Sequence, residues 1–280
     1  MISNQLARRG KEPFMSAAIE TEAPRTARTV SRAEWEEAMQ AHLAKEKKLM
    51  RLQDELAAER RLLPRVEVTK DYSFDTADGK ATLADLFAGK SQLFIKHFML
   101  SPGQTTQCVG CSLEVDHVGG LIEHLAANDI AYTVVARAPL AEIEAMKKRM
   151  GWTFPWVSSF HSDFGYDFGV SFRPEDVEAG RAMTRGGMAV PPGMLDMSGN
   201  DVFEKDESGR IYHTYTVSGR GGENFLGIYR YIDVTPKGRQ EPHYGSLADW
   251  ARPRPLYGEG GTVEANGRYH KGGCGCAVHG

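Results

Sequence analysis

Two cysteines three residues apart, placed where a buried strand passes into a helix, constrain this chain more than any other feature. Residues 92–100 are nearly all apolar, which predicts a strand covered on both faces. A short loop follows, and Cys108-Val-Gly-Cys111 then opens a stretch with helical periodicity. The first N–H groups of a helix have no partner within it, so they and the helix dipole favour a thiolate on Cys108. The turn is therefore expected to carry thiol chemistry.

The pattern around this turn predicts strands that alternate with helices. The helical stretch over 112–128 places its apolar residues on the face of Cys111, which is therefore expected to be buried. A strand over 130–136 and a helix over 141–150 come next. Because the connections are short and crossovers are right-handed, the strands at 92–100 and 130–136 are expected to be parallel neighbours.

The second half of the chain has weaker signals. Residues 152–200 show no periodicity and are expected to form an insertion that lies over the domain. Runs at 202–205 and 210–217 predict a hairpin that turns at Asp206-Glu-Ser-Gly209. A helical or irregular segment over 224–234 completes this part.

Four regions are expected along the chain. Ser31-Arg-Ala-Glu34 has the spacing of a capping box and predicts the start of a long helix that Pro64 ends. The apolar stripe of this helix is expected to pack on the main domain, and an arm that binds a partner or makes a homodimer is the alternative. The regions are a disordered leader (1–28), an N-terminal helical arm (29–64), an α/β domain (65–240) and a Gly/Pro-rich tail (241–280).

Composition excludes several classes of protein. A formal net charge of −3 is unlike that of a chain built to coat nucleic acid. No apolar run approaches the roughly 18–20 residues of a membrane helix, and the start of the chain lacks the apolar core of a signal peptide. We therefore expect a cytoplasmic protein with no nucleic-acid or membrane partner. Its four cysteines fall in two close pairs, which suits redox or metal chemistry in a reducing compartment.

Several separate stretches of the sequence resemble one family, over about residues 31–255. The chain is similar to the DUF899 family of thioredoxin-like dithiol-disulfide oxidoreductases, although Val109-Gly110 stands where that family usually has a Pro-containing pair. The resemblance implies an α/β thioredoxin-like fold with a long N-terminal helix and an insertion after the second βα unit. It also implies dithiol-disulfide exchange without an organic cofactor, on a protein or small-molecule disulfide or thiol, with the reducing partner unidentified. The stretches are Glu59-Arg-Arg-Leu-Leu-Pro64, Leu83-Ala-Asp-Leu-Phe87, Gln92-Leu, His97-Phe-Met99, Cys108-x-x-Cys-Ser112, Arg137-Ala-Pro139 and Arg149-Met-Gly-Trp-Thr-Phe-Pro-Trp-Val-Ser-Ser159.

The leading assignment of the site makes Cys108 the attacking thiolate and Cys111 the resolving thiol. A mixed disulfide on Cys108 can be released by a thiol one helical turn away. Lys96 and His97 end the strand that leads into the site, and their alternation directs at least one of them to the core or the helix. An ionisable group there would tune the thiolate, while a hydrogen-bonded His97 and a solvent-reaching Lys96 are the structural alternatives.

A thiol peroxidase is the second interpretation. Thr105 lies three residues before Cys108, as in the loop of peroxiredoxins, and Arg137 or Arg220 would polarise the peroxide. Both arginines are also explained as ordinary surface or packing residues. Thioredoxin-like proteins place a cis-proline beside the two cysteines, for which Pro155 and Pro192 are candidates.

The third interpretation is a metal-binding or metal-transfer protein. Cys274 and Cys276 in the tail could supply ligands together with Cys108 and Cys111, since zinc normally takes four. The same tail pair is also explained as a redox relay or as incidental. His117 and His124 lie on a helix flank expected to be exposed, and neither is expected to be a ligand.

Overall fold

The computed structural model describes residues 27–242, 247–264 and 267–271. The chain divides into two units, residues 1–43 and 44–280. Of the predicted leader, residues 1–26 lie outside the described residues. Within the described residues, no helix has the length and apolar composition needed to cross a membrane.

The long helix α1 (Arg32–Arg60) begins at the predicted capping box. Ser31 Oγ accepts the Glu34 N–H at 3.3 Å, and the Glu34 carboxylate accepts the Ser31 N–H at 2.9 Å. The helix buries none of its residues, and Met50 and Leu56 of the predicted apolar stripe are 62% and 41% exposed. Met50 and Leu56 are therefore exposed to solvent instead of packed on the main domain. The many lysine and arginine side chains of this helix are compatible with its exposure to water.

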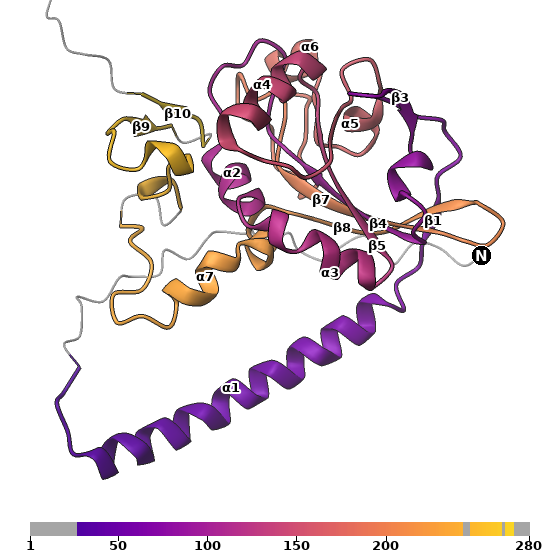
Figure 1. The fold of residues 1–280 in the computed structure, drawn as a ribbon. Coiled ribbons are helices and arrows are strands. Elements are labelled where there is room, and N and C mark those ends of the chain that lie inside the picture. Colours follow the sequence, from indigo (N-terminus) through magenta and orange to yellow (C-terminus); the bar gives the residue numbers. More distant parts are fainter. Residues whose placement is uncertain (1–26, 243–246, 265–266, 272–280) are drawn as a thin grey trace, which may run out of the picture. The chain divides into compact units, whose positions relative to one another are not determined.

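An eight-stranded sheet lies at the centre of the second unit (Figure 1). Its strand order is β1-β8-β7-β4-β5-β6-β2-β3. β4, β5 and β6 are parallel, and β7 pairs antiparallel with both β4 and β8. The predicted hairpin turn at 206–209 joins β7 to β8. The strands are β1 (Val66–Glu67), β2 (Ser73–Thr76), β3 (Gly79–Thr82), β4 (Gln92–His97), β5 (Ile130–Ala136), β6 (Trp156–Ser158), β7 (Gly199–Lys205) and β8 (Ile211–Ser218).

Within this sheet, the run β5-β4-β7-β8 carries the thioredoxin-like topology. β4 leads through helices to its parallel neighbour β5, and an antiparallel hairpin lies on the other side of β4. The cysteines follow β4 at the carboxyl end of the parallel strands. The predicted α/β fold with a long N-terminal helix is thus confirmed.

The helical stretch after Cys108 is divided into three short pieces, where the sequence predicted one run. Two glycines at the end of η2 weaken the helix at that point, but the apolar face continues from Cys111 through Val115 and Val118. The segment 152–200, predicted to be irregular, contains β6 and two short helices. The helices are η1 (Asp85–Phe87), α2 (Val109–Val115), η2 (Val118–Gly120), α3 (Ile122–Ala127), α4 (Leu140–Met150), α5 (Phe164–Asp167), α6 (Pro174–Glu178), η3 (Gly219–Phe225) and α7 (Gly227–Ile232).

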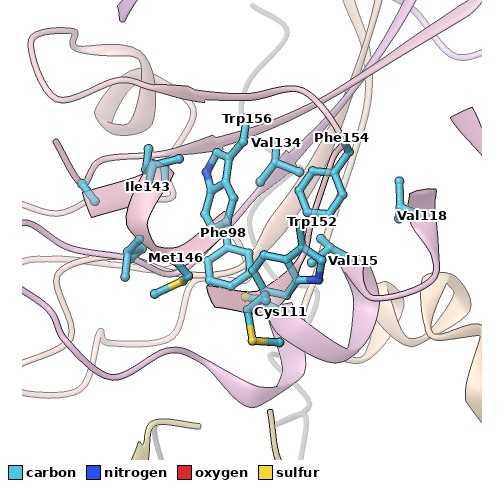
Figure 2. Close-up of a cluster of buried hydrophobic side chains, with 14 of the residues drawn as sticks. Phe98, Cys111, Val115, Val118, Val134, Ile143, Met146, Trp152, Phe154 and Trp156 are labelled. Atoms are coloured by element: carbon cyan, nitrogen blue, oxygen red, sulfur yellow. The ribbon is translucent and has the colours of Figure 1, made fainter. Parts of the chain in front are cut away.

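Each face of the sheet has its own core. On one face, α2 and α4 pack on β4, β5 and β6 around an aromatic cluster that includes Phe98, Trp152 and Trp156. Figure 2 shows Cys111 in the same cluster. The other face is covered by η1 and α5, whose Phe87 and Phe164 are fully buried. Both cysteines are therefore part of the hydrophobic core on the face of α2 and α4, with Cys111 the more deeply buried.

The described part of the region expected as a tail packs on α2 instead. Two 3₁₀ turns, η4 (Leu247–Asp249) and η5 (Arg254–Leu256), precede a small antiparallel pair, β9 (Thr262–Val263) and β10 (Tyr269–His270). Their apolar side chains form one buried cluster with Val109 of α2. Figure 1 shows β9 and β10 beside α2. The cluster centres on Val109, Ala251, Val263 and Tyr269.

Candidate dithiol site

Cys108 and Cys111 are both free thiols at the start of α2. Cys108 is the N-cap residue, and its Sγ accepts the Cys111 N–H at 3.4 Å. Cys111 Sγ accepts the Met99 N–H at 3.5 Å from the loop that follows β4. Cys108 is 6% exposed and Cys111 is 1% exposed. The structure thus places the two sulfurs as predicted, with Cys111 the more deeply buried, but it buries Cys108 as well.

A buried ion pair lies behind the two thiols. Lys96 on β4 is fully buried, and its Nζ lies 2.5 Å from Glu114 Oε2 and 2.6 Å from Ser198 Oγ. Ser198 directly precedes β7, whose first residue pairs with His97 at the end of β4. Burial by itself would lower the pKa of Lys96, but the charge and hydrogen bond of Glu114 together with the nearby Cys111 and Cys108 raise it, so the ammonium form persists.

This ammonium charge acts on both sulfurs, and the two thiols titrate as a unit. Burial alone would raise the pKa of Cys111, but the hydrogen bond from Cys108, the Lys96 charge and the Met99 N–H together lower it to about 6. The hydrogen bond to Cys111, followed by burial, raises the pKa of Cys108. At neutral pH the two cysteines therefore carry one proton between them, and one of the two sulfurs is a thiolate.

His97 lies on the opposite face of the sheet from this pair. Its Nε2 is 2.6 Å from Asp201 Oδ2, and the same buried carboxylate binds His213 and Arg185 at 3.0 Å and 2.6 Å. Burial lowers the pKa of His97, and the hydrogen bonds from both histidines hold the pKa of Asp201 below its ordinary value despite burial. Of the two residues that the sequence suggested for tuning the thiolate, Lys96 faces the site and His97 belongs to a separate network.

Three other predicted supporting residues lie elsewhere. Thr105 lines a cavity of about 230 Å³ between the loop before Cys108 and the C-terminal region. Arg137 holds Asp196 with two hydrogen bonds, at 2.9 Å and 2.7 Å. Pro155 precedes β6, and its carbonyl accepts the Val134 N–H. Among the described residues, none of the three is hydrogen-bonded to either cysteine.

The predicted cis-proline is not found. Every peptide bond in the described ranges is trans, including those before Pro155 and Pro192. Pro155 also leads into β6, which neighbours β5 rather than the strand that carries the site. Ser198, directly before β7, contacts the site from this direction through its hydrogen bond with Lys96.

The C-terminal region covers Cys108. Nothing in the sequence predicted this contact. The Val109 N–H donates to the Gly267 carbonyl at 2.9 Å, and the Tyr269 N–H donates to the Gln107 carbonyl at 3.4 Å. Between these bonds, Cys108 and Arg268 form an antiparallel bridge. A Cβ atom on Gly267 would lie 3.4 Å from Cys108 Sγ.

Glu114 is the other residue that sequence reasoning missed. Glu114 lies three residues after Cys111, so the two side chains are on the same face of α2. This spacing was the signal from which its place at the site could have been predicted. Its partner Lys96 is eighteen positions earlier in the chain. The C-terminal cover offered no comparable signal, because its strands are only two residues long.

The described residues contain no group of three or more His, Cys, Asp or Glu side chains that could hold a metal ion. Cys274 and Cys276, the predicted alternative ligands, lie outside the described residues.

The model of a family described as "Bacterial protein of unknown function (DUF899)" matches residues 24–257. No curated protein matches.

Among solved structures, the chain is similar to peroxidoxin BcpB from Mycobacterium tuberculosis, at 14% identity and a TM-score of 0.41, over 61% of this chain and 97% of that one. A PrxQ mutant from Xylella fastidiosa has 15% identity and a TM-score of 0.36, over 57% and 89%. A reduced 2-Cys peroxiredoxin from Plasmodium vivax has 12% identity and a TM-score of 0.36, over 61% and 93%.

Proposed function

The chain belongs to the DUF899 family, and we propose that it is a dithiol-disulfide oxidoreductase whose reacting groups are Cys108 and Cys111. One observation carries the proposal: two free thiols share a buried site with the Lys96 ammonium, where the pKa of one thiol is lowered to about 6. A thiolate is thus available at neutral pH, and the thiolate is the form that attacks a disulfide.

The reaction begins at Cys108, the more exposed of the two sulfurs. As a substrate disulfide approaches, the proton of Cys108 passes to Cys111, and the Cys111 N–H stabilises the Cys108 thiolate that remains. Cys108 Sγ attacks one substrate sulfur, the substrate S–S bond breaks, and the released thiolate takes up a proton from water. A mixed disulfide between Cys108 and the substrate results.

The second step closes the internal disulfide. Cys111 gives its proton to water, and its thiolate attacks Cys108 Sγ. The bond between Cys108 and the substrate breaks, and the second substrate thiolate leaves and takes up a proton from water. The substrate has gained two electrons and the protein has lost two. The Lys96 charge favours this step because it stabilises the Cys111 thiolate, while Glu114 and Ser198 hold the Lys96 side chain in place.

The substrate class we propose is a protein or small-molecule disulfide, in the cytoplasm, where a reducing pool would restore the dithiol. The thiol peroxidase interpretation relied on Thr105 and on Arg137 or Arg220. Thr105 lines a cavity beside the C-terminal region, Arg137 binds Asp196 and Arg220 lies 3.5 Å from Glu223, so the site supports disulfide exchange better.

A redox titration tests the proposal. The full chain is equilibrated in glutathione buffers, its free thiols are alkylated, and the tryptic peptide 97–137, which carries both cysteines, is weighed. We expect a reversible two-electron transition between about −120 and −270 mV, the span of exchange enzymes. Cys111→Ser is expected to stop at a stable glutathione adduct on Cys108, and Cys108→Ser to form neither product. If Cys108 and Cys111 never form a disulfide in these buffers, the proposal is contradicted.

A further inference from the structure

A second pocket lies on the same face of the sheet as the dithiol, and the proposed reaction does not use it. Its volume is about 720 Å³, which is within the range of cavities that hold small molecules. Residues of α2, η2 and α3 line one side and residues of η3 and α7 the other, while Phe94 of β4 and Tyr132 of β5 line it from the sheet. Figure 1 shows α7 near α2 and α3.

Aromatic rings form much of the wall of this pocket. The Tyr132 ring stacks on Phe94 with 5.6 Å between centroids, and Phe225 packs edge-on against Phe94 at 5.1 Å. Leu121 and Tyr231, which also line the pocket, are 44% and 73% exposed. Exposed apolar side chains gathered around a recess are typical of a ligand-binding groove. The wall therefore favours an occupant with an aromatic surface of its own.

One polar group in the wall has no partner. The Tyr132 hydroxyl is buried and forms no hydrogen bond within the described part of the chain, and Tyr132 as a whole is 8% exposed. Burial, and then the charge of Glu114, raise the pKa of Tyr132, so the hydroxyl keeps its proton. Glu114 lines the same pocket. Since buried hydroxyls in native proteins nearly always have a hydrogen-bond partner, this one is a donor that awaits an acceptor.

The charges around the pocket favour an uncharged occupant. Glu114 is buried, and its carboxylate is already paired with Lys96. A ligand anion beside Tyr132 would meet this carboxylate, and no lysine or arginine of the described residues lines the pocket to compensate it. A ligand cation would find the carboxylate already neutralised by the Lys96 ammonium. His117, the other ionisable side chain besides the tyrosines, is exposed to solvent.

We propose that this pocket binds an uncharged aromatic molecule with a carbonyl oxygen, which accepts a hydrogen bond from the Tyr132 hydroxyl. The aromatic part of the ligand packs against Phe94 and Phe225, and its carbonyl faces the sheet. The ligand thereby supplies the partner that the hydroxyl lacks. This binding site goes beyond the proposed disulfide exchange and does not depend on it, although Glu114 belongs to both sites.

Benzophenone is the probe for this site, because it is uncharged, carries aromatic rings on a carbonyl group and bonds to neighbouring C–H groups when irradiated. Its binding to the full chain is measured by equilibrium dialysis. We expect saturable binding of one molecule per chain. After irradiation and digestion with trypsin, we expect the adduct on peptides 97–137 and 221–230, which carry Tyr132 and Phe225.

The variant Tyr132→Phe isolates the hydrogen bond. It keeps the ring and is expected to bind benzophenone about tenfold more weakly than wild type. Diphenylmethane, which has the same rings without the carbonyl, should bind both proteins equally. The lost hydroxyl has no partner in the protein, so the Tm of the free variant should not fall. Tyr257→Phe, at an exposed tyrosine outside the pocket, is the control and should bind benzophenone as wild type does.

Three results would each overturn the site. They are an absence of saturable binding up to the solubility limit of benzophenone, adducts confined to other peptides, and equal affinity of wild type and Tyr132→Phe for benzophenone. None of them bears on the reaction of Cys108 and Cys111, which the redox titration decides separately.

Discussion

The ammonium group of Lys96 lies 2.5 Å from the carboxylate of Glu114, and both groups are buried directly behind the two thiols. Burial of two charges is costly, and such a pair adds little to stability compared with well-packed apolar residues. Its clearest consequence here is electrostatic, because the Lys96 charge favours a thiolate and the Glu114 charge opposes it. Lys96 and Glu114 therefore shift the pKa of the dithiol in opposite directions. Substitution of each residue in turn is expected to move this pKa in opposite directions as well.

Lys96→Met is expected to raise the pKa of the dithiol pair by about 1–2 units, because the nearest positive charge is lost. Thiolate absorbance against pH measures the shift in the reduced protein. Lys90→Met, at a lysine in the loop before β4, is the control and should leave the titration unchanged. Loss of one partner also leaves Glu114 uncompensated, at a cost of about 3–5 kcal/mol in the free energy of unfolding. An unchanged thiol pKa would show that Lys96 has only a packing role.

Glu114→Gln is expected to move the same pKa downward, by up to about one unit. The substitution keeps the shape and an oxygen that accepts from Lys96, but it removes the negative charge that raises the pKa of Cys111. The rate of alkylation by iodoacetamide between pH 5 and pH 7 reports the shift. An upward shift would mean that Glu114 acts chiefly by holding Lys96 in position.

Stability of the reduced protein should depend on pH through the dithiol. A thiol whose pKa is about 6 when folded and about 8.5 when unfolded binds fewer protons in the folded state between these values. The free energy of unfolding should therefore rise between pH 6 and pH 8.5, by at most about 1.4 kcal/mol per unit. It should fall again above pH 8.5, because the pKa of Cys108 is raised. Urea unfolding of wild type and Cys111→Ser checks this, and equal slopes for the two proteins would contradict it.

The local features of this fold could be predicted from the sequence. The capping box at Ser31, the strand over Gln92–His97, its parallel neighbour and the hairpin turn at 206–209 all depend on residues close together in the chain. The position of Cys108 as an N-cap is of the same kind. Such signals arise from backbone hydrogen bonding and apolar periodicity, which a few consecutive residues determine.

The electrostatics of the site could not be predicted in the same way. Lys96 and Glu114 meet only because β4 and α2 pack together, and Ser198, directly before β7, is 102 positions after Lys96 in the chain. The cover over Cys108 is held by backbone bonds from Gly267 and Tyr269 in a region rich in glycine and proline. Contacts of this type depend on tertiary packing, for which neither periodicity nor composition supplies a signal.

Asp201→Asn separates the second buried network from the dithiol. Asp201 holds His97, His213 and Arg185 on the other face of the sheet, so the variant leaves the half-buried Arg185 without its carboxylate. A loss of about 3–5 kcal/mol in the free energy of unfolding is expected, which corresponds to a fall in Tm of about 6–20 °C. The thiol titration should stay as in wild type, and a shift of about one unit would show that the two networks are coupled through β4.

Gly267→Val tests whether the C-terminal region shields Cys108. Gly267 has φ of +81°, a conformation that a β-branched residue rarely adopts, and its Cβ would lie 3.4 Å from Cys108 Sγ. The segment is expected to leave the active loop, and alkylation of Cys108 should become at least about fivefold faster. Gly209→Val in the turn between β7 and β8 is the control, since it has a similar φ of +86° in open space away from the site. Equal rates in the two variants would mean that Cys108 is reached without displacement of the segment, and the burial of Cys108 would then not limit exchange with large disulfides.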